Sequence, residues 1–246
     1  MAKREASGSG QGAALLKAVE RIVDAPAEIR SRVEQASESI RASLPDDATE
    51  EQIRSSLERN LISHYSNRTA IAGGASALPG LVPGLGSLAA VLGGGLLDMT
   101  LCLKFEVEMV LALAASRGYD IEDPRERQLA YLLAAAHTYE ASGGKNPLPD
   151  LVKTEIDAVW HYTPRQLGKV VAALFVKLAL MFAGKGLARA IPFIGVVVSS
   201  AANKTLTSRV GKAVVKALDG RQKAHAPPPG SEPKAKKAPA RGKKPA

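Results

Sequence analysis

The fold of this chain is decided by residues 85–120, whose sequence is LGSLAAVLGGGLLDMTLCLKFEVEMVLALAASRGYD. The stretch is apolar over most of its length, and before Ser116 its charged residues are Asp98, Lys104, Glu106 and Glu108. We predict a long helix from about Leu85 to Ser116 that stops at Gly118, because a glycine just after the last turn is a common helix C-cap. A helix with so little charge must be covered, either by other helices or by lipid.

The rest of the chain is also predicted to be helical. Ala and Leu supply 69 of its 246 residues, and no alternating apolar and polar stretch of strand length stands out. Pro26, Pro124, Pro164 and Pro192 suit the first turns of helices, where proline is favoured. We therefore expect an all-α multi-helix bundle with a disordered N-terminus (residues 1–11), N-terminal helices (12–62), a helical domain (63–220) and a disordered Lys/Pro/Ala tail (221–246).

An uncharged stretch of 29 residues, Thr69 to Leu97, precedes and enters the long helix. It predicts a hydrophobic helical hairpin rich in glycine and proline, marked by Pro79, Gly80, Pro83, Gly84, Gly86, Gly93, Gly94 and Gly95. The best candidate to span a membrane is Leu85 to Leu103, in which Asp98 offsets most of the gain from the apolar side chains. Two interpretations stay open: the apolar helices form the core of a soluble bundle, or the hairpin inserts into or lies on a membrane.

The formal net charge of +9 is distributed unevenly along the chain. Residues 1–157 hold 16 bases and 22 acids, whereas residues 158–246 hold 17 bases and two acids. The 61 residues between Asp157 and Asp219 contain nine bases and no acid. An asymmetry of this kind favours an anionic partner, either a membrane surface or nucleic acid.

The last predicted helix, from Pro192 to about Leu218, becomes amphipathic after Asn203. Its apolar positions include Val210 and Val214, and its basic positions are Lys204, Arg209, Lys212 and Lys216. A helix with one buried apolar face and one basic face can meet lipid phosphates, so these four residues are the candidate lipid or anion contacts. An ordinary solvated face of a basic protein is the alternative.

No residue pattern for catalysis or metal binding stands out. The four histidines have no second ligand at helical spacing, and the single cysteine, Cys102, excludes a Cys-based zinc site and an intramolecular disulfide. We expect no enzyme and no cofactor. The acids of the long helix are candidates for buried charges, and we expect Asp98, Glu106 and Glu108 to pair with Arg189 or Lys177 from the basic half.

Several of these segments resemble the bacterial EcsC family. The resemblance rests on Pro79-Gly80 to Gly86, Asp98, Met109 through Asp120, Pro192-Phe193-Ile194-Gly195, and Val210-Gly211-Lys212-Ala213. It covers about residues 60 to 219 and leaves the N-terminal helices and the tail outside. It implies an all-helical bacterial protein, encoded in some genomes near an ABC exporter, with no catalytic residues to transfer.

Together, these features predict a non-enzymatic, membrane-associated protein at the cytoplasmic face. We expect it to bind an anionic membrane surface or a membrane protein, as an accessory to a transporter. The alternative is a nucleic-acid-binding protein that acts through its basic C-terminal tail, where phosphate contacts would be independent of base sequence.

Overall fold

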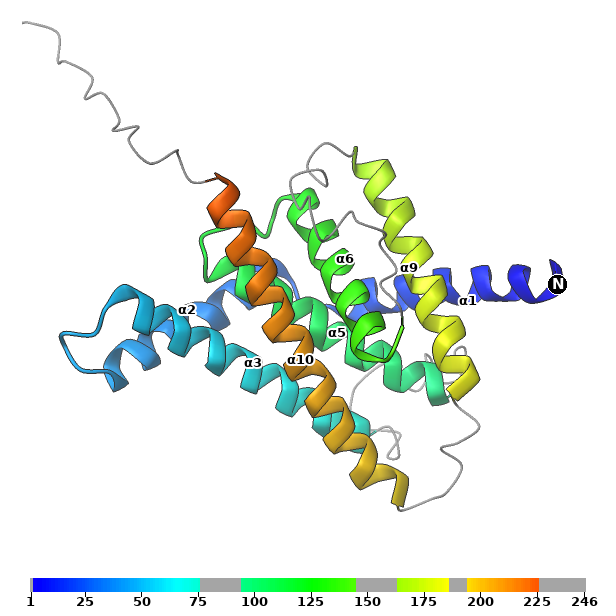
Figure 1. Cartoon of the computed structure of the whole chain (residues 1–246), viewed down its shortest axis with the longest axis horizontal. Coiled ribbons are helices and arrows are strands. Elements are labelled where there is room, and N and C mark those ends of the chain that lie inside the picture. The colour runs from blue at the N-terminus through cyan, green and yellow to red at the C-terminus, as the bar shows by residue number, and fades with distance from the viewer. Residues whose placement is uncertain (1, 76–93, 145–162, 186–193, 226–246) are drawn as a thin grey trace, which may run out of the picture.

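The computed structural model describes residues 2–75, 94–144, 163–185 and 194–225. Within these ranges every regular element is a helix, which confirms the predicted all-α class (Figure 1). The helices are α1 (Ala2–Ile22), α2 (Pro26–Ser43), α3 (Glu50–Ala75), α5 (Gly94–Ala115), α6 (Pro124–Ala141), α9 (Pro164–Lys185) and α10 (Ile194–His225).

Local sequence sets several helix starts. Pro124 is the first residue of α6, and the preceding Asp123 side chain accepts a hydrogen bond from the backbone N–H of Arg125 at 2.8 Å. The start of α9 is a capping box, in which the Thr163 hydroxyl accepts from the Gln166 N–H while the Gln166 side chain accepts from the Thr163 N–H. These bonds satisfy backbone donors that a helix start otherwise leaves open.

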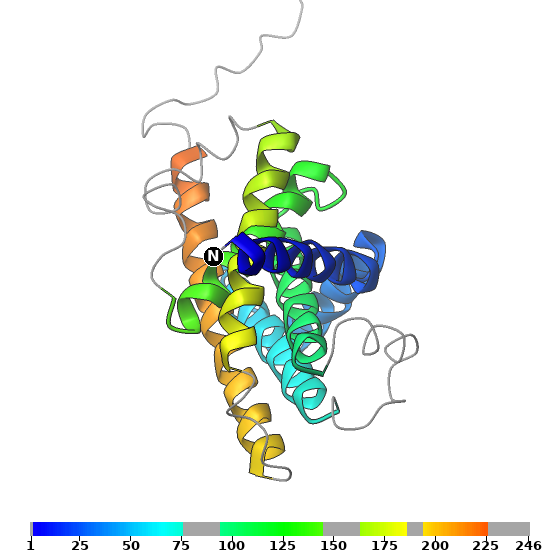
Figure 2. The same ribbon diagram turned by 90° about the vertical axis from the view of Figure 1, so that its right-hand side faces the viewer.

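The apolar helix α5 is the centre of the bundle. It packs against each of the other described helices, which surround it in two views at right angles (Figures 1 and 2). Every residue from Val107 to Ala114 is at most 5% exposed. The helix ends where the sequence predicts, with Gly118 at φ 81° and the Tyr119 N–H bonded to the Ala114 carbonyl at 3.1 Å.

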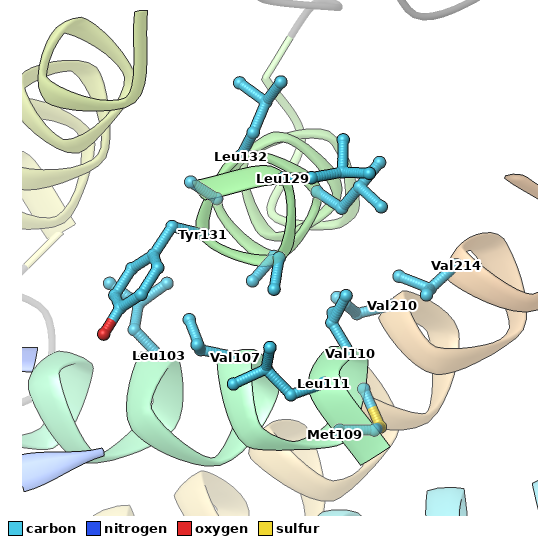
Figure 3. Close-up of a cluster of buried hydrophobic side chains, with 14 of the residues drawn as sticks. Leu103, Val107, Met109, Val110, Leu111, Leu129, Tyr131, Leu132, Val210 and Val214 are labelled. Atoms are coloured by element: carbon cyan, nitrogen blue, oxygen red, sulfur yellow. The ribbon is translucent and has the colours of Figure 1, made fainter. Parts of the chain in front are cut away.

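The helix α10 is held on this centre by its apolar side. Val210 and Val214 are fully buried, and they point from α10 toward Val110 of α5 beneath the leucines of α6 (Figure 3). Burying each side chain of this size stabilises the fold by about 1.5–3 kcal/mol. The seam between α5, α6 and α10 therefore fixes which face of α10 points outward.

Two glycines allow close helix contacts. A Cβ on Gly12 of α1 would lie 2.5 Å from the Cα of Val176 in α9. A Cβ on Gly211 of α10 would lie 2.8 Å from Cγ1 of Ile62 in α3. At Gly12 the nearest atoms include backbone, which cannot move aside cheaply, whereas at Gly211 the Ile62 side chain would have to shift. Gly211 brings α10 directly onto α3.

The structure corrects the predicted disorder at both ends. Residues 2–11 were expected to be disordered, but they form the first turns of α1. The helix that packs near Gly12 extends toward the N-terminus, where the sequence begins with the good helix formers Ala, Lys, Arg and Glu. Residues 221–225, expected to start the disordered tail, are the last turn of α10. This turn is anchored because the Arg221 guanidinium is hydrogen-bonded to Glu126 of α6.

Most of the predicted hairpin lies outside the described residues, including Pro79, Gly80, Pro83, Gly84, Gly86 and Gly93, whereas Gly94 and Gly95 open α5. Within the described part of the chain, no helix combines the length and the hydropathy needed to cross a membrane.

Candidate functional site

The basic residues predicted to contact an anionic partner lie on the outer side of α10. The side chains of Lys204, Arg209, Lys212 and Lys216 are all exposed. Residues on the opposite side of the same helix, Val210 and Val214, are fully buried. We call these four bases the α10 basic face.

Two acids near this face, Asp219 and Glu58, are both paired with Arg117. Asp219 is the one acid of α10, and its carboxylate pairs with Nη1 of Arg117 at 2.8 Å. Arg117 also binds Glu58 of α3 through Nη2, at 2.6 Å, and through Nε, at 2.9 Å. Within the described ranges, no residue of the α10 basic face has an ion-pair partner, so its charge is open to solvent or to an external anion.

A second clamp holds the end of α10 and was missed at the level of sequence. The Arg221 guanidinium makes two hydrogen bonds to the Glu126 carboxylate, at 3.0 and 2.6 Å, and both side chains are only 7% exposed. The guanidinium also lies over the Tyr119 ring, 3.9 Å from its centroid. Arg221 was assigned to the basic tail, but it is a structural residue that fixes α10 on the start of α6.

A groove of about 420 Å³ opens beside the α10 basic face, between α10 and α3. Its basic residues are Lys204 and Lys212 from α10 and Arg59 from α3. The remaining lining combines hydroxyls with two aliphatic side chains and one acid: Ser55, Ser63, Ser66, Ser208, Ile62, Val215 and Glu58. Three bases line the groove against one acid, Glu58, which is also paired with Arg117, so the groove is positively charged and well suited to an anion.

The predicted buried acid Glu106 is fully buried, but its described partners are uncharged. Its carboxylate contacts the hydroxyls of Thr138 and Thr207 and the thiol of Cys102. Burial raises the pKa of Glu106 to about 7, and these three hydrogen bonds oppose the rise. Lys177 of α9 is not among these described partners of Glu106.

Of the other residues in that prediction, Asp98 lies in the first turns of α5, and Arg189 lies outside the described residues. Glu108 pairs with Lys104, one turn earlier on α5, and accepts a hydrogen bond from the backbone N–H of Asp24 at 2.9 Å. The Lys104 ammonium also contacts the Asp24 carboxylate at 2.9 Å. Burial raises the pKa of Glu108, and Lys104 opposes that rise. This network ties the end of α1 to α5 and is structural.

Another pocket, of about 270 Å³, lies where α1, α6 and α9 meet and includes Glu20, Arg127, Gln128 and Tyr131. Burial raises the pKa of Tyr131 to about 12, so its hydroxyl stays protonated at neutral pH. In the described part of the chain, no three His, Cys, Asp or Glu side chains are grouped to hold a metal ion.

In the comparison with known families, the model of the EcsC protein family matches residues 13–221. The matched region starts well before residue 60, so it includes the N-terminal helices that the resemblance left outside. Comparison with curated proteins and with solved structures gives no significant match.

Proposed function

The chain belongs to the EcsC protein family, and we propose that it is a binding protein that docks on the anionic cytoplasmic face of a membrane. The α10 basic face is the observation that carries the proposal. It presents four exposed bases, while Asp219 of the same helix and Glu58 of the adjoining α3 are paired with Arg117. An uncompensated row of bases on a rigid helix is attracted by the negative potential of anionic lipids.

The expected strength follows from the number of charges. Each Lys or Arg near an anionic surface contributes about 1 kcal/mol, so four bases supply about 4 kcal/mol, or about a thousandfold in partitioning. The large apolar side chains that the described surface exposes most are Ile71 of α3 and Leu180 of α9, neither of them on α10. Binding through the α10 basic face is therefore electrostatic and should weaken steeply with salt.

Vesicle flotation of the full chain tests this proposal. The protein should float with vesicles of phosphatidylcholine and phosphatidylglycerol at low salt, and it should stay in the soluble fraction with pure phosphatidylcholine. The fourfold variant Lys204→Gln, Arg209→Gln, Lys212→Gln, Lys216→Gln should lose most of this binding. Its fold should persist, because all four side chains are exposed and unpaired among the described residues.

A second fourfold variant is the matched control. Lys17, Arg21, Arg54 and Arg125 are also exposed, lie on α1, α3 and α6, and give the same net charge when changed to glutamine. If both variants float equally well, or if the wild type ignores anionic vesicles, the proposal is wrong. Retarded migration of duplex DNA without flotation would favour nucleic-acid binding instead.

A further inference from the structure

The groove between α3 and α10 is lined by a base that does not belong to the α10 basic face. Arg59 of α3 faces the same space as Lys204 and Lys212 of α10. Two of the four bases of that face, Arg209 and Lys216, do not line the groove. We propose that the groove binds the phosphate of a phospholipid headgroup, with phosphatidic acid as the preferred class; this inference rests on the proposed membrane docking.

The charge of the groove matches a phosphomonoester. Three bases from two helices converge on it, and its one acid, Glu58, is bound by the buried Arg117 at 2.6 Å. A phosphomonoester carries a charge of about −1.5 to −2 near neutral pH, whereas the phosphodiester of phosphatidylglycerol carries a single charge. Three cations around one small volume therefore favour the monoester.

Hydroxyl groups add hydrogen-bond donors at the same place. Ser63 of α3 and Ser208 of α10 both line the groove, and within the described ranges neither hydroxyl has another hydrogen-bond partner. The Ser66 hydroxyl is different, since it donates to the Ile62 carbonyl at 2.7 Å. Arginine can bind phosphate through two parallel N–H groups, and lysine supplies a point charge. The phosphate site is therefore built from both walls of the groove. The α3 wall supplies Arg59 and Ser63, and the α10 wall supplies Lys204, Ser208 and Lys212.

The aliphatic part of the groove favours a lipid over a free phosphate ion. Ile62 and Val215 line it together with the bases, so part of any occupant meets hydrocarbon. A volume of about 420 Å³ exceeds what a phosphate ion requires and falls in the range of sites for small organic ligands. The phosphate with its glycerol backbone fits this combination, while the acyl chains remain in the bilayer that the adjoining basic face contacts.

The contact at Gly211 sets the geometry of the groove. Gly211 immediately precedes Lys212 on α10, and it packs against Ile62 of α3. The Arg117 clamp joins the same two helices through Glu58 and Asp219. Both walls of the site are therefore fixed relative to each other before any ligand binds, which lowers the entropic cost of binding.

Flotation with two sets of anionic vesicles tests the inference on the full chain. The sets contain phosphatidic acid or phosphatidylglycerol in phosphatidylcholine, matched in surface charge by zeta potential. The wild type should bind the phosphatidic acid vesicles about tenfold more tightly. Arg59→Gln and Lys212→Gln should each abolish this preference, because each removes a charge-assisted hydrogen bond to the phosphate.

Each variant has a matched control on its own helix. Arg54 is exposed on α3 and Lys216 is exposed on α10, and neither lines the groove. Arg54→Gln and Lys216→Gln should therefore weaken binding to both vesicle sets equally and keep the preference. All four side chains are exposed, so unchanged thermal unfolding is expected and separates a binding defect from misfolding.

The possible failures are distinguishable. Equal binding to both charge-matched sets would overturn the headgroup site while leaving membrane docking intact. Absence of binding to either set would remove the proposed function and the inference together. Glycerol 3-phosphate serves as the soluble probe: if it binds in calorimetry while phosphatidic acid vesicles gain no preference, the site is for a soluble phosphate and the lipid assignment is wrong.

Discussion

Arg117 and Asp219 meet at 2.8 Å, where the end of α5 passes α10. The Arg117 side chain is only 1% exposed, whereas that of Asp219 is 45% exposed. The same guanidinium holds Glu58 of α3 at 2.6 Å. One buried cation therefore joins three helices and pairs with two carboxylates beside the α3–α10 groove.

This arrangement predicts unequal effects for the two acids. Glu58→Gln should lower the free energy of unfolding by about 3 kcal/mol, because it removes the more buried partner of a buried charge. Asp219→Asn should cost about 1 kcal/mol, since its carboxylate is partly solvated. Urea unfolding measures both. Glu50→Gln is the control, as its ion pair with Arg41 is exposed and should contribute little. Equal losses for Glu58→Gln and Glu50→Gln would contradict the buried clamp.

The contact between α1 and α9 gives a second prediction. Gly12→Ala should destabilise the protein by about 1–3 kcal/mol, because the new methyl would lie 2.5 Å from the Val176 Cα, and a backbone atom cannot move aside cheaply. Gly168→Ala in α9 is the matched control. Nothing lies within 4 Å of a Cβ there, so alanine should raise stability by up to about 1 kcal/mol through its helix propensity. Thermal or urea unfolding compares the two, and a Gly12→Ala variant as stable as the Gly168→Ala variant would show that the helices do not approach this closely.

Much of the helical architecture follows from local signals. The prolines at 26, 124 and 164 begin helices as expected, and the Arg117-Gly118-Tyr119 segment ends one. The basic and apolar sides of α10 were also predicted, because helical periodicity places Val210 and Val214 opposite the bases. These features depend on residues a few positions apart, so one sequence is enough to reveal them.

Contacts between distant residues could not be predicted in the same way. Arg221 and Glu126 are separated by 95 positions, and the surrounding Lys, Pro and Ala made Arg221 look like part of a disordered tail. The walls of the α3–α10 groove come from helices whose relative placement depends on the Gly211 contact with Ile62. No spacing rule links Arg59 to Lys212. The only signal available was Gly211 itself, as a small residue on an otherwise amphipathic helix.

The buried Glu106 predicts a specific pH dependence of stability. Burial raises its pKa from 4.5 to about 7 in the folded protein, so the folded state holds this proton over a pH range in which the unfolded state has released it. The contribution of Glu106 to stability should therefore fall as pH rises from 4.5 to 7, by about 3 kcal/mol in total. The protonated form fits the site, because Thr138 can accept from the carboxyl and donate to the Ala134 carbonyl at 2.6 Å.

Glu106→Gln isolates this effect, since glutamine has nearly the shape of the protonated acid. Urea unfolding at several values between pH 4.5 and 8 should show the variant gaining about 3 kcal/mol relative to the wild type toward the alkaline end. Glu34→Gln, at an exposed position of α2, should run parallel to the wild type. A constant difference between wild type and Glu106→Gln across this range would mean that the carboxyl titrates near its ordinary pKa.

Two truncations separate the basic tail from the end of α10. Removal of residues 226–246 begins after the last residue of α10, and it should leave the unfolding free energy unchanged within about 0.5 kcal/mol. Removal of residues 221–246 also deletes Arg221 and leaves the Glu126 carboxylate buried without that partner, so it should cost about 3–5 kcal/mol. Adding Glu126→Gln to the longer truncation should recover part of this loss, because an uncharged amide is cheaper to bury.

Urea unfolding of these three variants beside the full chain gives the comparison, and equal stability of the two truncations would show that Arg221 contributes nothing to the fold. The shorter truncation is also the correct one for binding experiments, because any loss of lipid or DNA binding can then be assigned to the tail and not to a loosened α10.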